Sequence, residues 1–120
     1  MHDISRFEMI QMGDEVLEKI EAGIQRVLAD PALKSELAGW TRTVALRVDR
    51  DDYTICIENS SMSVVREKAR SPDVEIRVDK ATFMDIASGK LSFTAAYLRE
   101  LLSVKGDVRA SDITRLQKLL

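Results

Sequence analysis

The sequence DKATFMDIASGKLSFTAAYLRELLSVKGD, which runs from Asp79 to Asp107, decides how the rest of the chain is arranged. Asp79 is suited to begin a helix, because its side chain can accept hydrogen bonds from the free backbone N–H groups of the first turn. Phe83 and Ile86 give that helix one apolar face at helical spacing. Gly89 should end it, since glycine takes the left-handed conformation that closes a helix at little steric cost.

A second apolar run follows in the same stretch and leads to a turn at Gly106 and Asp107. Its end predicts a strand through Leu102 and Val104. Asp107 is placed to cap a closing helix, in which Ile113, Leu116 and Leu120 line one side. The run is too apolar to face water alone. Its members are Leu91, Phe93, Tyr97, Leu98, Leu101, Leu102 and Val104.

The first 39 residues predict helices with one apolar side. From Gly13 onward, apolar residues fall at steps of three and four, which is the spacing of a helix face. Asp30 and Pro31 interrupt this helix, because proline disfavours the helical conformation of the residue before it. Pro31 suits the first turn of a new short helix through Leu37, and Gly39 ends the segment. The apolar positions are Val16, Leu17, Ile20, Ile24, Val27 and Leu28.

After Trp40 the apolar period changes from near four to two, which predicts strands with one apolar face. Two strands form a hairpin around a turn at residues 50–52, and a third, weaker strand follows a turn at residues 59–61. A polar loop over residues 67–72 leads to the fourth strand. The alternating apolar residues are Val44, Leu46 and Val48, then Tyr53, Ile55 and Ile57, then Met62 and Val64, and then Val74, Ile76 and Val78.

These elements predict an α+β fold in one domain. A chain of 120 residues is long enough to bury one core and too short for two. We expect a single domain over residues 1–120, with a helical N-terminal segment over 1–39 and the sheet, central helices and C-terminal helix over 40–120. Since each strand has only one apolar face, helices should cover one side of a single sheet and leave the other side exposed.

Composition and charge argue against several classes of function. The formal net charge is -2, from 18 basic and 20 acidic residues spread along the chain, so no basic stripe is available for nucleic acid. No stretch approaches the roughly 20 apolar residues of a membrane span, and no secretory signal is visible. Cys56 is the only cysteine, which favours a reducing compartment. We therefore expect a cytoplasmic protein.

Few residues are candidates for catalysis or metal binding. His2, the only histidine, lies beside the start of the chain, where order is usually low. Cys56 should point to the more polar face of its strand with no histidine placed beside it, which favours a structural cysteine over a nucleophile. Asp49, Asp51 and Asp52 fall in the predicted hairpin turn without the glycine and glutamate of a calcium-binding loop. We expect no catalytic residue, metal or cofactor, and no enzyme activity.

The order of the motifs over residues 74–120 resembles that of a known family. The strand Val74 to Asp79 is followed by Phe83, Ile86, Gly89-Lys90-Leu91 and Ala96, and Val104-Lys105-Gly106-Asp107 then precedes a leucine-rich closing helix. In this order and spacing the chain resembles the sterol carrier protein 2 (SCP2) family of small lipid-binding domains, and its first half agrees in outline. One departure is clear. The family usually has Gly-Lys-Leu-Lys leading into the last strand, where this chain has Glu100-Leu101-Leu102-Ser103.

The resemblance implies a single five-stranded, mixed and mainly antiparallel sheet with helices covering one face. It also implies a tunnel between the sheet and the helices that holds an apolar ligand, such as a fatty acid, an acyl-CoA, or a sterol-like or quinone-like lipid. Removal of apolar ligand surface from water would drive binding. The residues expected to line the tunnel are Phe83, Ile86, Leu91, Phe93, Tyr97, Leu98 and Leu101.

Two other interpretations stay open. The same apolar residues are consistent with a filled core, and the domain would then be a scaffold or dimerisation module that forms a homodimer or supports an enzyme partner. Glu100 and Leu101, where the family pattern is broken, favour this interpretation, as does the apolar N-terminal helix. The third interpretation is a thiol enzyme that uses Cys56.

Overall fold

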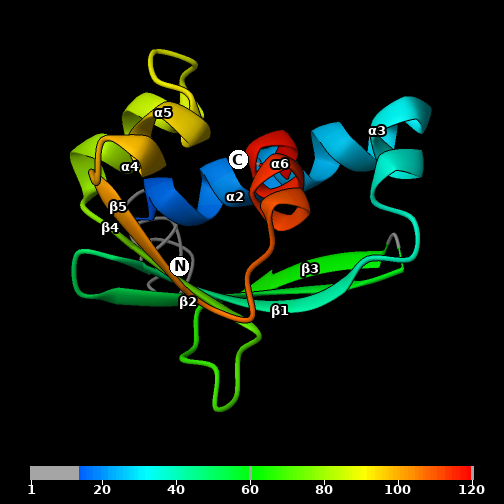
Figure 1. Ribbon diagram of the computed structural model, residues 1–120, viewed down its shortest axis with the longest axis horizontal. Coiled ribbons are helices and arrows are strands. Elements are labelled where there is room, and N and C mark those ends of the chain that lie inside the picture. The colour runs from blue at the N-terminus through cyan, green and yellow to red at the C-terminus, as the bar shows by residue number, and fades with distance from the viewer. Residues whose placement is uncertain (1–13, 60, 120) are drawn as a thin grey trace, which may run out of the picture.

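The computed structural model describes residues 14–59 and 61–119 of the chain. The expected helical structure over residues 1–13, His2 and the expected contact of Leu120 lie outside the described residues. The helices form one layer on a single sheet (Figure 1). In chain order, the elements are α2 (Glu15–Ala29), α3 (Pro31–Glu36), β1 (Thr41–Val48), β2 (Asp51–Glu58), β3 (Ser61–Val65), β4 (Val74–Val78), α4 (Lys80–Ala87), α5 (Phe93–Leu98), β5 (Leu102–Gly106) and α6 (Ala110–Leu119).

The sheet has five strands in the order β3-β2-β1-β4-β5, so β3 and β5 are its edge strands. The pair β1 and β4 is parallel, and the other neighbouring pairs are antiparallel. The register aligns the apolar residues of each strand with those of the next. For example, Leu46 on β1 is the Cα partner of both Tyr53 on β2 and Ile76 on β4. The predicted α+β fold with a mixed, mainly antiparallel sheet is confirmed.

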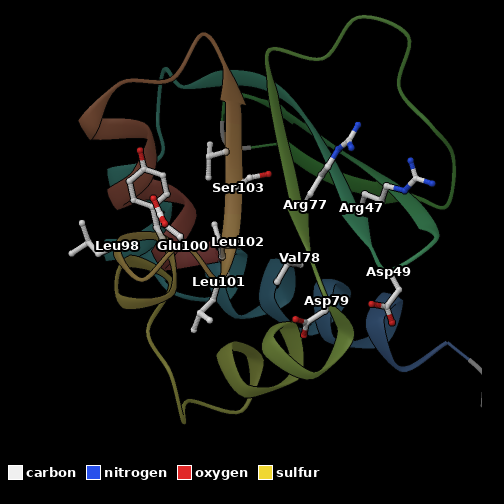
Figure 2. A pocket seen from close by; sticks show the side chains of 12 residues that line it. Arg47, Asp49, Arg77, Val78, Asp79, Leu98, Glu100, Leu101, Leu102 and Ser103 are labelled. Carbon is white, nitrogen blue, oxygen red and sulfur yellow. The ribbon is translucent and has the colours of Figure 1, made fainter.

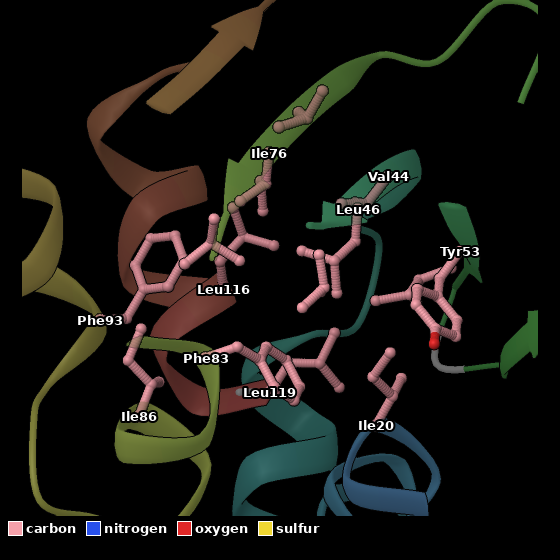
Figure 3. Close-up of a cluster of buried hydrophobic side chains, with 14 of the residues drawn as sticks. Ile20, Val44, Leu46, Tyr53, Ile76, Phe83, Ile86, Phe93, Leu116 and Leu119 are labelled. Atoms are coloured by element: carbon pink, nitrogen blue, oxygen red, sulfur yellow. The ribbon is translucent and has the colours of Figure 1, made fainter. Parts of the chain in front are cut away.

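The core lies between the sheet and the helices (Figure 3). Helix α2 contributes Val16, Ile20, Ile24 and Val27, which are its buried apolar residues. Its apolar face is therefore already covered within the domain. The other core residues come from every strand except β3, from α4, α5 and α6, and from the loops: Leu37, Trp40, Val44, Leu46, Val48, Tyr53, Ile55, Ile57, Val74, Ile76, Val78, Phe83, Ile86, Phe93, Ala96, Leu102, Leu116 and Leu119.

The helices begin and end largely where the sequence predicts. The side chain of Asp79 accepts a hydrogen bond from Thr82 N at 2.7 Å at the start of α4, and Gly89 after its end has φ +82°. The prediction for Asp107 is wrong, because α6 begins at Ala110 and it is Asp112 that accepts a hydrogen bond from Arg109 N, at 2.9 Å. Asp107 instead uses its backbone N–H in a loop contact.

The hairpin between β1 and β2 is tighter than the sequence indicates. Asp51 and Asp52 belong to β2, so the connection consists of Asp49 and Arg50 alone. Asp49 has φ 55°, a left-handed conformation that aspartate tolerates better than most residues. The predicted three-residue turn is thus replaced by a two-residue turn, which brings Asp49 to the end of β1 beside β4, where its N–H donates to Val78 O at 3.0 Å.

Two buried carboxylates tie the helical layer to the sheet. Asp112 on α6 accepts a hydrogen bond from Trp40 Nε1 at 2.7 Å, and Asp14 accepts one from the Tyr53 hydroxyl at 2.8 Å. Burial raises the pKa of Asp112, but hydrogen bonds from Arg109 N and Trp40 and the nearby arginine charges outweigh it, so the pKa lies below its ordinary value. Burial, together with the bond to Asp14, raises the pKa of Tyr53.

Among the helices that the structure describes, none lies on the other face of the sheet (Figure 1). Cys56 is exposed on this open face, as predicted, whereas Thr54 is buried because the loop between β3 and β4 leans over it. The hydroxyl of Thr54 donates to Glu67 O in that loop at 2.7 Å. Apart from Ala45 and Val65, the strand residues on the open face are polar, which matches the alternation of apolar and polar residues in β1, β2 and β4.

Candidate functional site

A groove of about 1090 Å³ lies at the edge of the sheet (Figure 2). It follows the start of β5 and the end of α5, and it reaches the open face of the sheet beside β4 and β1. We call it the edge groove. It is lined by Arg47, Asp49, Arg77, Val78, Asp79, Tyr97, Leu98, Glu100, Leu101, Leu102, Ser103 and Val104.

A particular turn after α5 forms one wall of the edge groove. Glu100 N donates to Tyr97 O at 3.1 Å and Leu101 N donates to Ala96 O at 2.9 Å, which is the hydrogen-bond pattern of a Schellman cap. Glu100 occupies the position of the cap that takes a left-handed conformation, with φ 61°. Helix α4 ends in the same pattern with Gly89 at that position. Glutamate thus ends α5 in the same kind of turn in which glycine ends α4.

Three apolar side chains in the edge groove face solvent. Tyr97 is 38% exposed, Leu101 44% and Leu98 74%, and these are three of the four large apolar residues that the described chain exposes. The fourth, Val65, lies on β3 at the opposite edge of the sheet. Exposed apolar side chains gathered in a hollow are typical of a binding surface, whereas isolated ones are common on any protein.

Charged side chains line the other end of the edge groove. Arg47 and Arg77 lie on the open face of the sheet, and Figure 2 shows them extending in the same direction. Asp79 uses one carboxylate oxygen to cap α4, and Asp49 Oδ1 accepts a hydrogen bond from Lys80 N at 3.2 Å. Glu100 adds a third negative charge beside the apolar part. The groove is therefore amphipathic along its length.

A second, smaller hollow of about 330 Å³ lies among the helices. Ile86, Leu91 and Phe93 line it, together with Arg26 of α2. The guanidinium of Arg26 donates from Nη2 to Lys118 O at 2.9 Å, which joins α2 to α6 at the side of this hollow. Its remaining lining residues are Ala87, Gly89, Ser92 and Gln117.

The structure divides the residues that were predicted to line one tunnel. Tyr97, Leu98 and Leu101 lie in the edge groove, Ile86, Leu91 and Phe93 line the smaller hollow, and Phe83 is buried in the core. Helix α5 separates the two hollows, with Phe93 at its first residue and Leu98 at its last. Sequence reasoning missed Arg47 and Arg77, because each is an ordinary polar position in an alternating strand and only the pairing of β1 with β4 brings them together.

The described residues also show how the potential metal ligands and Cys56 are arranged. No group of three or more histidine, cysteine, aspartate or glutamate side chains among residues 14–59 and 61–119 could hold a metal ion. Cys56 lies between Thr43 and Ser63, its Cα partners on the adjacent strands, and neither partner is a histidine. Within the same part of the chain, the helices are too short or too polar to span a bilayer.

Comparisons with known proteins agree with this architecture. The family model of the SCP-2 sterol transfer family matches residues 20–120. Among curated proteins, no sequence matches the chain. The crystal structure of sterol carrier protein 2 like 2 from Aedes aegypti has a TM-score of 0.66 and 17% sequence identity, and the match covers 92% of this chain and 99% of that one. A solution structure of the palmitated form of that protein has a TM-score of 0.64 and 17% identity over 88% and 91% of the two chains.

Two further similar structures come from enzyme-related settings. The ubiquinone synthesis protein UbiJ has a TM-score of 0.59 and 17% identity over 92% of this chain and 94% of its own. The stereoselective inverting sec-alkylsulfatase Pisa1 from a Pseudomonas species has a TM-score of 0.57 and 18% identity, and the match covers 72% of this chain. This chain spans only 13% of the sulfatase. At these identities, the likenesses show the fold alone.

Proposed function

Because the chain belongs to the SCP-2 sterol transfer family, we propose that it binds a lipid and does not catalyse a reaction on it. The observation that carries the proposal is the edge groove, with Tyr97, Leu98 and Leu101 exposed inside it. Ligand pockets typically enclose about 300–1000 Å³, so a groove of this size has room for an acyl chain. The palmitated Aedes aegypti protein supports a fatty acyl ligand for a domain of this shape.

The driving force is the removal of apolar surface from water. Each methylene that is fully buried contributes about 0.8 kcal/mol. The edge groove is open along one side, so we expect about half of that value, which corresponds to roughly a twofold gain in affinity per added methylene. Affinity should therefore rise steadily with acyl-chain length, with loose selectivity for the exact chain.

Helix α5 is the element that could bring the two hollows together. It is a short helix of six residues, which is attached to the domain by the buried Phe93 and Ala96 and by a hydrogen bond from Thr94 to Gln117 on α6. We propose that a longer ligand displaces α5 and reaches Leu91 and Ile86 in the smaller hollow. The predicted tunnel between sheet and helices would then form with the ligand bound.

Two experiments test the proposal. Native mass spectrometry of the gently purified protein detects lipid that co-purifies. A titration with the uncharged probe phenylnaphthylamine, followed by its displacement with fatty acids of increasing length, measures binding. We expect lipid to co-purify with the protein. We also expect the concentration of fatty acid that displaces half of the probe to fall as the acyl chain becomes longer. A protein of bare mass that binds neither the probe nor any fatty acid would remove the proposal.

A second candidate function is a scaffold or dimerisation module. It is favoured by Leu98 and Leu101, which are exposed beside the unpaired edge of β5, and by the fold shared with UbiJ. Helix α2 does not support it, because the apolar face of α2 is buried in the domain's own core. Light scattering across a concentration series tests self-association, and a protein that stays monomeric up to high concentration would speak against a homodimer.

A further inference from the structure

The chemistry of the ligand's polar end can be inferred from the charged end of the edge groove. We propose that Arg47 and Arg77 together bind the carboxylate of a long-chain fatty acid whose hydrocarbon tail lies on Leu98 and Leu101. This inference rests on the proposed lipid-binding function and adds the class of the ligand's headgroup. Nothing in the fold or the family match assigns a role to either arginine.

The sheet register places the two arginines side by side. Arg47 on β1 and Arg77 on β4 are Cα partners in the parallel pair, and paired strands lie about 4.8 Å apart. Their neighbours Leu46, Val48 and Val78 point into the core, so the two guanidinium groups share the open face. Two adjacent guanidinium groups can offer four or more N–H donors to the two oxygens of one carboxylate.

The two arginines lie opposite one another, and Asp52, Glu75 and Lys68 line a hollow of the open face together with them. Like charges directly opposite one another on a sheet are destabilising. Within the described residues, neither Arg47 nor Arg77 forms an ion pair, even though Asp52 is the Cα partner of Arg47 on β2. An anion bound between the two guanidinium groups would relieve this repulsion, which is a gain that a neutral ligand could not provide.

The groove connects this pair to the apolar side chains. Ser103 on β5 is the Cα partner of Arg77, and Leu101 lies just before β5 in the same groove. Figure 2 shows Ser103 between the arginines and the side chains of Leu98 and Leu101. A molecule that lies along the groove thus meets cations at one end and hydrocarbon at the other, which fits an amphiphile with an anionic head.

The charge of the groove favours a single carboxylate over a phosphate. Its two arginines are accompanied by Asp49, Asp79 and Glu100, so the lining carries one more negative charge than positive charge. A phosphate monoester carries a charge of about -1.5 to -2 at neutral pH and would meet more repulsion from these acids than a carboxylate does. An acyl-CoA, with several phosphates, would be disfavoured further.

The test compares dodecanoate with dodecan-1-ol, which has the same tail and no charge, by displacement of phenylnaphthylamine at low ionic strength. The variants are Arg47→Gln and Arg77→Gln. Lys105→Gln is the matched control, because Lys105 is exposed on the open side of β5 but does not line the groove. Dodecyl phosphate serves as the second anion. The melting temperature of each unliganded variant reports whether the fold is retained.

We expect the unmodified protein to bind dodecanoate about tenfold more tightly than the alcohol, since a hydrogen-bonded charged group commonly contributes that much. The preference should shrink in Arg47→Gln and Arg77→Gln, persist in Lys105→Gln, and weaken with added salt. Equal binding of acid and alcohol, unchanged in both arginine variants, would overturn the headgroup assignment and leave the lipid-binding function intact. Tighter binding of dodecyl phosphate than of dodecanoate would overturn the choice of carboxylate. Failure to bind any of these amphiphiles would overturn both proposals.

Discussion

Replacement of Glu100 by glycine should make the protein more stable. Glu100 has φ 61°, in the left-handed region, where an L-residue with a side chain costs about 1–2 kcal/mol. Glycine removes that cost but loses about 0.5–1 kcal/mol more backbone entropy on folding. The net expectation is a gain of about 0.5–1 kcal/mol in the free energy of unfolding. For a domain of this size, the melting temperature would rise by about 3 °C.

Urea unfolding followed by circular dichroism measures this effect, and two variants isolate its cause. Glu100→Gln keeps the side chain beyond Cβ and removes only the charge, so its stability should match that of the unmodified protein. Gly89→Ala imposes the opposite change on the equivalent cap of α4, where φ is +82° and no atom lies within 4 Å of the added Cβ. It should lose about 1 kcal/mol. The reasoning would be refuted if Gly89→Ala is destabilised as expected while Glu100→Gly gains nothing.

Four other substitutions probe the core, the edge groove, the buried carboxylate and a close backbone approach at the end of β5. Phe93→Asp should prevent folding, because Phe93 is 1% exposed, whereas Tyr97→Asp, at a residue 38% exposed, should retain the fold by circular dichroism and weaken lipid binding. Asp112→Ala should lower the free energy of unfolding by about 3 kcal/mol at pH 7. The pKa of Asp112 in the folded protein lies below its ordinary value of 3.8. The ionised Asp112 therefore stabilises the fold above pH 3.8, and this stabilisation is lost as the pH falls through the folded pKa. In urea titrations, the difference in stability between Asp112→Ala and the unmodified protein should become smaller at about pH 3 and below. Gly106→Ala should cost at least about 2 kcal/mol by thermal unfolding, because φ is +107° and an added Cβ would collide with the backbone oxygen of Asp73; a melting temperature equal to that of the parent would contradict this.

Periodicity predicts most of the fold because it records which side of each element meets the core. The alternation in β1, β2 and β4 places their apolar residues on one face, and the three- and four-residue steps in α2 do the same. Local chemistry also identifies the cap at Asp79 and the end of α4 at Gly89. The same local chemistry gives the wrong residue at the start of α6. The sequence favours Asp107 as the cap, whereas Asp112, inside the helix, accepts the hydrogen bond from Arg109 N. Both aspartates lie near the start of the helix, so position in the sequence does not show which of them accepts that bond.

The site was harder to predict because it depends on pairing between distant segments. Arg47 and Arg77 become neighbours only when β1 and β4 pair in parallel. Similarly, the sequence shows Phe93 and Leu98 as members of one apolar run, while the structure buries the first and exposes the second. Apolar character alone does not show which side chains pack in the core and which line a cavity. The seven residues predicted to line one tunnel therefore include residues of two separate hollows and of the core.

The central claim is that the exposed leucines of the edge groove bind an acyl chain. The most direct measurement is the affinity of dodecan-1-ol for the double variant Leu98→Ser/Leu101→Ser, compared with Val65→Ser, which removes an exposed apolar side chain at the opposite edge of the sheet. Loss of contact with both leucines should cost about 2 kcal/mol, or roughly 30-fold in affinity, while Val65→Ser should bind as the unmodified protein does. Equal affinities for all three proteins, with the fold retained, would contradict the claim.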